Sequence, residues 1–160
     1  QLALVEKVIN DSQSEMRALL LHLRPISLEN KTLVQGIESL LKELTTKVQL
    51  SLHWELDEVT LPSTFEDHLF RIVQELVSNT LRHAKAKQLE VFLKQKDDYI
   101  ILKLVDDGIG FDTSVSKAGS YGLKNIEERV AGMGGQCKII SIANQGTIIE
   151  IKIPQKQEKE

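Results

Sequence analysis

The sequence is poor in the residues that define several functional classes. A single cysteine, Cys137, excludes a framework of internal disulfide bonds and suits a reducing compartment. No Cys/His cluster has the spacing of a zinc site. No apolar run reaches the ~18 residues expected of a membrane-spanning helix. Disulfide scaffolds, zinc modules and membrane spans are therefore excluded for this stretch of chain.

Strong charge of one sign and aromatic residues are also missing. The formal net charge is −3 and the Lys and Arg residues are scattered, which argues against a nucleic-acid-binding surface. Aromatic residues make up 4% of the chain and hydrophobic residues 41%, so we expect an aliphatic core. The 160 residues suit one domain with a small appendage. Because the sequence starts inside a helical pattern, we expect it to be part of a longer protein.

Residues 1–24 have the pattern of one long amphipathic helix. Mostly apolar residues recur at alternating intervals of three and four, which is the a/d seam of a helical bundle. Two interpretations remain open: the helix packs on its own domain, or it belongs to a bundle such as a dimer interface. Pro25 should end the helix, because proline cannot easily continue it. The seam residues are Leu2, Val5, Ile9, Ser12, Met16, Leu19 and Leu23.

The remaining chain alternates between helix and strand patterns. Ser63 or Thr64 is the expected N-cap of the third helix. The order of the elements predicts an α+β domain, a two-layer α/β sandwich with its helices on one face of the sheet. The expected helices are 28–48, 65–84 and 121–133, the expected strands are 51–56, 88–95, 99–106, 136–143 and 147–154, residues 107–120 are expected to form a mobile loop, and residues 155–160 a disordered tail.

A polar stripe follows the apolar face of the third helix. Glu75, Asn79, Arg82 and His83 are spaced by three or four residues, so we expect them on one side of the helix. A carboxylate and an amide oxygen on successive turns suit a hard cation such as Mg²⁺, or an activated water, with phosphates as further ligands. Arg82 could neutralise phosphate charge. The alternative is a solvated helix face with one Glu–Arg pair.

The stretch VDDGIGFD (105–112) places Asp106 and Asp107 at the end of a strongly apolar strand. Gly108 and Gly110 then weaken that strand. Asp and Gly commonly form turns, so the stretch on its own is either a turn or a binding site.

Four segments together resemble the GHKL family of ATP-binding domains, which includes gyrase, Hsp90, histidine kinases and MutL. Glu75-x-x-x-Asn79 with Arg82-His83 is similar to the N box of that family, and DDGIGF to its G1 box. SYGLKNIEERV is similar to the G2 box, and NQGT to the late Gly-Thr element. The resemblance covers residues 28–154. It implies a mixed sheet in the GHKL (Bergerat) arrangement, and it implies ATP and Mg²⁺ as ligands.

The resemblance also implies roles for individual residues. Asp106 would accept a hydrogen bond from the adenine amine, since an ionised carboxylate is an acceptor only. Asn79 would bind Mg²⁺, and Glu75 would orient or deprotonate the attacking group. Thr147 would lie near the adenine through a water. Asp107 is expected to be a solvated neighbour.

Several glycines also belong to the implied nucleotide site. Gly108 and Gly110 would let the backbone pass close under the purine and turn into a lid, 108–121, which we expect to be disordered without nucleotide. Gly122 would begin a helix whose N-terminal amides receive phosphates. Many histidine kinases have Gly-x-Gly-Leu here, whereas this chain has Ser120 at the first position, a departure that concerns the phosphate contacts of the lid. The remaining implied nucleotide-binding residues are Arg82, His83, Gly119 and Leu123.

Within the family, the segments ELVSNTLRHA, GLKNIEERV and LHLRP are similar to NarL-type sensor histidine kinases, especially the Gram-positive cell-envelope-stress sensors LiaS and VraS. This likeness implies that residues 1–27 are the second helix of a dimerisation and phosphotransfer hairpin. The phosphoacceptor histidine is expected outside this chain, since neither His22, His53 nor His68 has the acidic neighbour that such a histidine usually has. The chain would form a homodimer in the full-length protein and pass phosphate to a NarL-type response regulator.

The same likeness implies the cytoplasmic domain of a membrane-anchored bacterial sensor, with the membrane segments outside this chain and no direct binding to nucleic acid. Three other functions remain open. An ATP-hydrolysing switch, as in gyrase or Hsp90, suits the Glu75/Asn79 pair, although the long extra segments of those proteins are missing here. An anti-sigma serine kinase has the same fold, but the helix at 1–24 argues against it. A helical dimerisation module with a degenerate site would lack ATP affinity.

Overall fold

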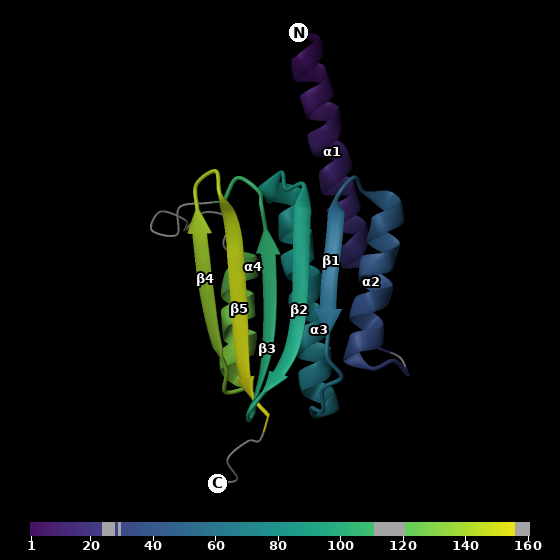
Figure 1. Cartoon of the computed structure of the whole chain (residues 1–160). Helices are drawn as coiled ribbons and strands as arrows, with labels where there is room; N and C mark the ends of the chain where they lie inside the picture. Colours follow the sequence, from purple (N-terminus) through teal and green to yellow (C-terminus); the bar gives the residue numbers. More distant parts are fainter. Residues whose placement is uncertain (24–27, 29, 111–120, 156–160) are drawn as a thin grey trace.

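The computed structural model describes residues 1–23, 28, 30–110 and 121–155 (Figure 1). The helices and strands alternate largely as the sequence predicts. In chain order the elements are α1 (Leu2–Leu23), α2 (Leu33–Lys47), β1 (Ser51–Leu56), α3 (Ser63–Asn79), the π-helix η1 (Thr80–Ala84), β2 (Gln88–Lys96), β3 (Tyr99–Asp106), α4 (Tyr121–Gly132), β4 (Gln136–Ile142) and β5 (Gly146–Pro154).

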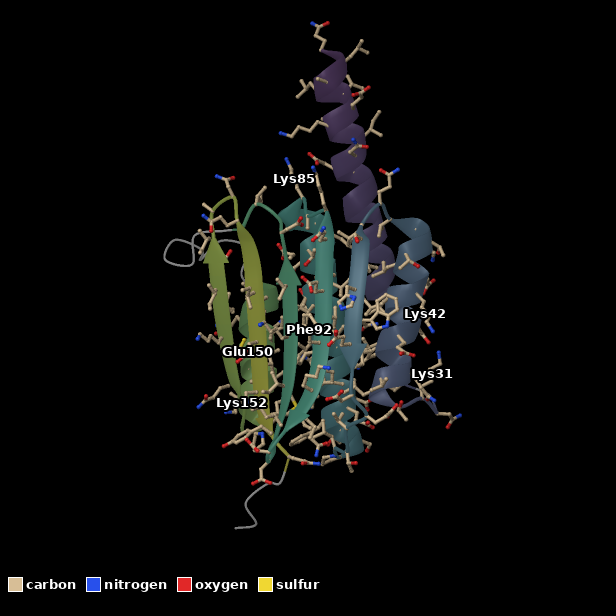
Figure 2. The ribbon with its side chains drawn as sticks, in the orientation of Figure 1. Lys31, Lys42, Lys85, Phe92, Glu150 and Lys152 are labelled. Atoms are coloured by element: carbon tan, nitrogen blue, oxygen red, sulfur yellow. The ribbon has the colours of Figure 1, made fainter. Side chains whose placement is uncertain are left out.

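The strands form one mixed sheet in the order β1-β2-β3-β5-β4. β1 runs parallel to β2, and the other neighbouring strands are antiparallel. Figure 1 shows α3 and α4 behind the sheet and α2 beside β1, where α2 also contacts α3, so the predicted two-layer arrangement is confirmed. The opposite face carries the half-exposed side chains of the alternating strands, including Phe92 and Glu150, which are labelled in Figure 2.

The core between the sheet and the helices is aliphatic, as the composition predicts. Side chains that are 0–2% exposed come from every layer, and among the buried residues that the structure describes only Phe65 and Phe70 are aromatic. Burial of each large aliphatic side chain stabilises the fold by about 1.5–3 kcal/mol. Cys137 and Trp54 lie half-buried at the edge of this core. Representative fully buried residues are Ile37, Leu41, Ile72, Leu76, Val91, Leu102 and Ile151.

Two helix starts differ from the sequence-based predictions. α2 begins at Leu33 instead of 28, because Thr32 and Gln35 form a capping box there. α3 begins at Ser63, with Pro62 at the N-cap position and no side-chain cap. The expected cap by Ser63 or Thr64 is therefore wrong. The carbonyl of Pro62 accepts hydrogen bonds from the amides of Phe65 and Glu66, and no side chain caps the first turn.

The third helix also changes its winding before it ends. It is α-helical to Asn79 and then forms a π-helical turn from Thr80 to Ala84. Lys85 stops it with a left-handed backbone, φ +48°. Single π-turns in helices occur frequently at functional sites. The helix predicted over 65–84 is thus present, but its last turn has a different register from a continuous α-helix.

Helix α1 ends at Leu23, just before Pro25 as predicted, and contacts α3 and η1. Its N-terminal part extends beyond the sheet (Figure 1). There the apolar residues Leu2, Val5 and Ile9 are 81%, 54% and 50% exposed. None of the described helices is both long and apolar enough to cross a membrane.

Candidate nucleotide-binding site

The residues singled out by the sequence gather at one end of the sheet. Asp106 is the last residue of β3, where it pairs with Leu89 of β2 on one side and Thr147 of β5 on the other. η1 and the beginning of α4 lie at this same end (Figure 1). Lys85, which ends η1, is labelled there in Figure 2. Segments far apart in sequence, η1, the end of β3 and the start of β5, therefore form one surface around Asp106.

The carboxylate of Asp106 is half-buried, and the Gly108 amide donates a hydrogen bond to its Oδ1 at 2.9 Å. Burial raises the pKa of Asp106 above its ordinary value, and the nearby charge of Asp107 adds to this, while the Gly108 amide, the backbone of Thr147 and the hydroxyl of Thr80 lower it. The site thus holds a desolvated but well-oriented hydrogen-bond acceptor.

Asp107, the next residue, makes different hydrogen bonds. Its side chain is exposed, as expected, but Oδ1 accepts hydrogen bonds from the backbone amides of Lys87 and Gln88, both at 2.8 Å. These two amides begin β2. The expectation that Asp107 is only a solvated neighbour is therefore incomplete, because its carboxylate joins the start of β2 to the end of β3 by two hydrogen bonds.

Thr147 lies in a buried polar pair with Ser141 of the neighbouring strand. Thr147 is 8% exposed, and its Oγ1 is 2.8 Å from Ser141 Oγ. Ser141 and Thr147 face each other in the register of β4 and β5. Gly146, just before Thr147, has φ +108°, and a Cβ there would collide with the carbonyl oxygen of Asp106. Only glycine therefore allows β5 to approach the end of β3 this closely.

The two glycines of the DDGIGF segment have distinct surroundings. Gly108 is buried and donates its amide to Asp106. Gly110 has φ +62°, and a Cβ there would collide with the backbone carbonyl of Ile142. The carbonyl of Ile109 accepts a hydrogen bond from Asn144 at 2.6 Å. This segment therefore leaves β3 along the β4–β5 hairpin, toward residues 111–120, so that the expected lid lies mostly outside the described residues.

The polar stripe of the third helix is described in part. Glu75 and Asn79 are half-buried, one turn apart, and Asn79 is the last residue of α3. Arg82 donates from Nη2 to the Oγ of Ser78, a fully buried residue, at 3.0 Å. Ser78 and Arg82 are four residues apart, which is the ordinary spacing of neighbours on one helix face. That all four residues of the stripe share one side stays a prediction.

The remaining predicted residues are placed in part. His83 belongs to η1, but its side chain lies outside the described part of the structure, as does Gly119 altogether. Tyr121 and Gly122 form the first turn of α4, where backbone amides without helical partners point toward the Asp106 end of the sheet. Leu123 is half-buried and packs against the core.

Residues 64–157 match the family described as histidine kinase-, DNA gyrase B-, and HSP90-like ATPase. The chain belongs to this ATPase family. The match spans α3, the end of β3, α4 and β5, which are the elements that surround Asp106. It therefore supports ATP as the ligand of the site described above.

The relatives of this ATPase-family chain include sensor proteins. The sensor protein VraS of Staphylococcus aureus is 46% identical over 158 residues, and that of Staphylococcus epidermidis is 45% identical over 159 residues. The predicted likeness to VraS is confirmed. Each match covers 99% of this chain but 46% of the relative, so the chain spans about half the length of these curated relatives.

Solved structures with a similar fold are also histidine kinases. The histidine kinase domain of the blue-light activated kinase of Erythrobacter litoralis EL346 superposes with a TM-score of 0.67 at 18% identity, covering 91% of this chain and 75% of that one. The histidine kinase AdeS of Acinetobacter baumannii gives 0.64 at 15% identity, covering 98% and 81%. At these identities the likeness concerns the fold alone.

The donor set around the site fits Mg²⁺ in the way that the ATPase family implies. Among the residues that the structure describes, no three His, Cys, Asp or Glu side chains gather into a metal cluster. Asn79 and Glu75 offer one amide and one carboxylate on adjacent turns. Mg²⁺ usually takes one or two protein ligands and completes its shell with phosphate and water. The site therefore suits an ion that arrives with a nucleotide and is too sparse to hold one by itself.

Sequence reasoning missed two polar residues of the site, Thr80 and Ser141. Thr80 is 8% exposed on the buried side of η1, directly after Asn79. Ser141 lies opposite Thr147. The hairpin register around Asn144 could have indicated Ser141, because counting back from the turn pairs these two residues. No local signal indicates Thr80, since Asp106, whose pKa it lowers, follows 26 residues later.

Proposed function

We propose that this chain is the catalytic region of a two-component sensor histidine kinase of the NarL type. Residues 28–154 form its ATP-binding domain, residues 1–27 form part of a dimerisation hairpin, and residues 155–160 form a tail. The domain transfers the γ-phosphoryl of ATP to a histidine outside this chain. The main support is the half-buried Asp106 carboxylate, oriented by the Gly108 amide, in a chain 46% identical to VraS over nearly its whole length.

At the adenine end, the Asp106 carboxylate accepts a hydrogen bond from the 6-amino group. Its half-buried position removes competing water, and hydrogen bonds in such surroundings are stronger than in bulk water. The Gly108 amide keeps Oδ1 in place. The hydroxyl of Thr147 reaches the adenine through a water, and Ser141 fixes that hydroxyl at 2.8 Å. Gly110 turns the backbone away so that the lid can start beside the base.

At the phosphate end, the two N-box residues on α3 and the first turn of α4 act together. Asn79 offers its amide oxygen to Mg²⁺, and bound Mg²⁺ would neutralise charge on the phosphates. Glu75 orients or deprotonates the attacking histidine. Gly122 leaves the amides at the start of α4 accessible to phosphate oxygens. Further contacts to the nucleotide are proposed for Arg82, His83, Gly119 and Leu123.

Helix α1 supports the assignment of a dimerising sensor. Leu2, Val5 and Ile9 form an exposed apolar seam that needs a covering helix. We expect a homodimer through the complete hairpin in the full-length protein, on the cytoplasmic side of a membrane-anchored sensor. A NarL-type response regulator then receives the phosphate on an aspartate and binds DNA.

Calorimetric titration of ATP, with and without Mg²⁺, tests the nucleotide site. Wild type should bind Mg-ATP, and Asp106→Asn should lose most of that affinity because an amide cannot offer the same acceptor set. Asp98→Asn is the matched control. It removes the same charge from an exposed turn between β2 and β3, at the other end of the strands, and should bind as wild type. Equal ATP affinity of all three proteins would refute the assignment of Asp106 to adenine binding.

Phosphotransfer requires a second assay. The chain is incubated with radiolabelled ATP and a purified hairpin of the full-length sensor that contains the phosphoacceptor histidine. Acid-labile, base-stable label on that hairpin supports the kinase. Rapid ATP hydrolysis with no labelled hairpin would instead indicate an ATPase switch, and label on a partner's serine would indicate an anti-sigma kinase.

A further inference from the structure

A pocket lies between α3 and α4, at the end of both helices that is remote from the nucleotide site. The first two turns of α3 and the last turns of α4 line it, at the lower end of the sheet in Figure 1. Its distance from Asn79 is about 20 Å along α3, at ~1.5 Å per residue. The cavity has a volume of about 470 Å³, within the ~300–1,000 Å³ typical of small-molecule sites. None of its lining residues belongs to the nucleotide site.

The floor of the pocket is apolar. Phe65 and Met133 are 9% and 1% exposed, so both belong to the core, and both line the pocket. An aromatic ring suits this floor, because aromatic rings pack on one another and the sulfur of a methionine makes favourable contacts with them. Gly132, the last residue of α4, keeps the mouth of the pocket open, since a Cβ there would meet nothing within 4 Å.

The wall beside this floor presents hydrogen-bond donors. Arg129 Nη1 lies 3.1 Å from Nδ1 of His68, and both residues are half-buried. A guanidinium has no acceptor, so Arg129 donates and the lone pair of His68 Nδ1 accepts. His68 is therefore the neutral tautomer with its proton on Nε2. The pair offers a ligand only N–H groups, those that remain on Arg129 and the Nε2–H of His68.

The charges of the lining residues limit the kind of anion that fits. Arg129 is accompanied by one carboxylate, that of Glu128, while Thr64 and Asn125 are uncharged, and all three of these neighbours are exposed. With one cation and one anion in the lining, a ligand of single negative charge is favoured over a dianion such as a phosphate monoester. A guanidinium matches the planar shape of a carboxylate and can donate two parallel hydrogen bonds to it.

From this arrangement we propose that the pocket binds a carboxylate attached to an aromatic ring. The carboxylate accepts hydrogen bonds from Arg129 and His68, and the ring packs over Phe65 and Met133. Two sources have this chemistry, a free aryl carboxylic acid and a peptide chain that ends in phenylalanine. The inference does not rest on the proposed function, because no residue of the nucleotide site takes part.

The two methionines of the chain provide a direct readout. Labelling with [methyl-¹³C]methionine gives one NMR signal from Met133 and one from Met16, which lies on α1 and serves as the internal reference. The titrants are 3-phenylpropionate for the free acid and N-acetylphenylalanine for the chain terminus. We expect a saturable shift of the Met133 signal, because an aromatic ring changes the chemical shift of a nearby methyl group, with no shift of Met16. The titrant that binds more tightly identifies the source.

An uncharged titrant and three variants test the role of the charge and the position of the ligand. 3-Phenylpropionamide, which has the same shape without the charge, should bind about tenfold more weakly, because charge-assisted hydrogen bonds are the stronger ones. Arg129→Met should weaken binding of the acid to a similar extent. Arg71→Met is the matched control, since Arg71 is an exposed arginine of α3 that does not line the pocket. Gly132→Leu should block the mouth, and leucine is a better helix former than glycine.

Thermal unfolding of each variant checks the fold, and Arg129→Gln replaces Arg129→Met if the methionine variant is unfolded. Failure of both acids to shift the Met133 signal would overturn the inference. Equal affinity for acid and amide, or acid binding that persists in Arg129→Met or Gly132→Leu, would overturn it too, as would equal shifts of Met16 and Met133. Loss of ATP binding has no bearing on these results, so a protein that binds the acid and no ATP would strike the proposed function alone.

Discussion

The adjacent aspartates Asp106 and Asp107 should give opposite phenotypes when substituted. Asp107→Ala removes an acceptor from the amides of Lys87 and Gln88, both 2.8 Å from Oδ1. A typical intramolecular hydrogen bond contributes about 0.5–1.5 kcal/mol, so the two together should lower the free energy of unfolding by about 1–3 kcal/mol. For a domain of this size that corresponds to a fall in Tm of about 2–4 °C per kcal/mol.

Asp106→Asn should leave the stability of the fold unchanged or raise it, and should weaken nucleotide binding. Burial raises the pKa of Asp106 in the folded protein. A carboxyl with a raised pKa contributes stability below its unfolded pKa and loses that contribution as the pH rises through its folded pKa, so at neutral pH its charge opposes folding. The neutral amide avoids this penalty. We therefore expect Asp106→Asn to be at least as stable as wild type at pH 7, and to lose nucleotide affinity.

Urea unfolding at pH 7 and ATP titration of both variants test this pair of phenotypes together. Asp107→Asn is the control for Asp107→Ala, because its amide oxygen can still accept from both backbone amides, and it should recover most of the lost stability. The reasoning would be refuted if Asp107→Ala unfolded within 0.5 kcal/mol, roughly the spread of neutral surface substitutions, of wild type. Loss of ATP affinity in Asp107→Ala with the folded state intact would refute it equally.

Three further predictions concern the same end of the sheet. Gly146→Ala should lower the free energy of unfolding by about 1–3 kcal/mol, because φ is +108° and the added Cβ would meet the Asp106 carbonyl. The control Gly132→Ala, whose Cβ would meet nothing within 4 Å, should be neutral or stabilising in thermal melts. Asn79→Ala should remove the difference between ATP titrations with Mg²⁺ and with EDTA, and hardly change Tm, since this side chain is half-buried at the end of α3. Lowering the pH toward the raised pKa of Asp106 should stabilise nucleotide-free wild type relative to Asp106→Asn, which denaturant titrations from pH 7 to 4 would measure. The opposite trend would mean that burial is not the main influence on the pKa of Asp106.

Patterns of local spacing gave most of the fold. Strands β1 and β3 follow the sequence-based predictions to the residue, because alternation of apolar residues specifies them, and α1 ends one residue before the predicted 24, close to Pro25. The GHKL arrangement came from the resemblance, since local periodicity cannot give the strand order β1-β2-β3-β5-β4. The start of α3 was missed because a hydroxyl residue after Pro62 has the appearance of a cap, although the proline carbonyl takes that part.

The candidate site was predictable where its residues lie on one element and not where they meet across elements. Glu75 and Asn79 share a helix, and their spacing of four is enough to place them together. The π-turn from Thr80 to Ala84 is not revealed by helical periodicity, because the residues of that turn continue the pattern of the helix before it. That Thr80 lies near enough to Asp106 to lower the pKa of its carboxyl depends on how closely η1 approaches the end of β3, which only the packed structure shows.

The position of Asp106 in the sheet explains how a charge can be desolvated and still reach a ligand. β3 is the central strand, so its last residue has a paired strand on each side, with Leu89 of β2 and Thr147 of β5 as direct neighbours. An aspartate at the end of an edge strand would have water on one side, and its pKa would be less affected. At the end of a central strand the neighbours exclude water laterally, while the strand end remains open along its axis. A carboxylate in this place is both costly to ionise and accessible from one direction, which is what selection of a single donor group on a purine requires.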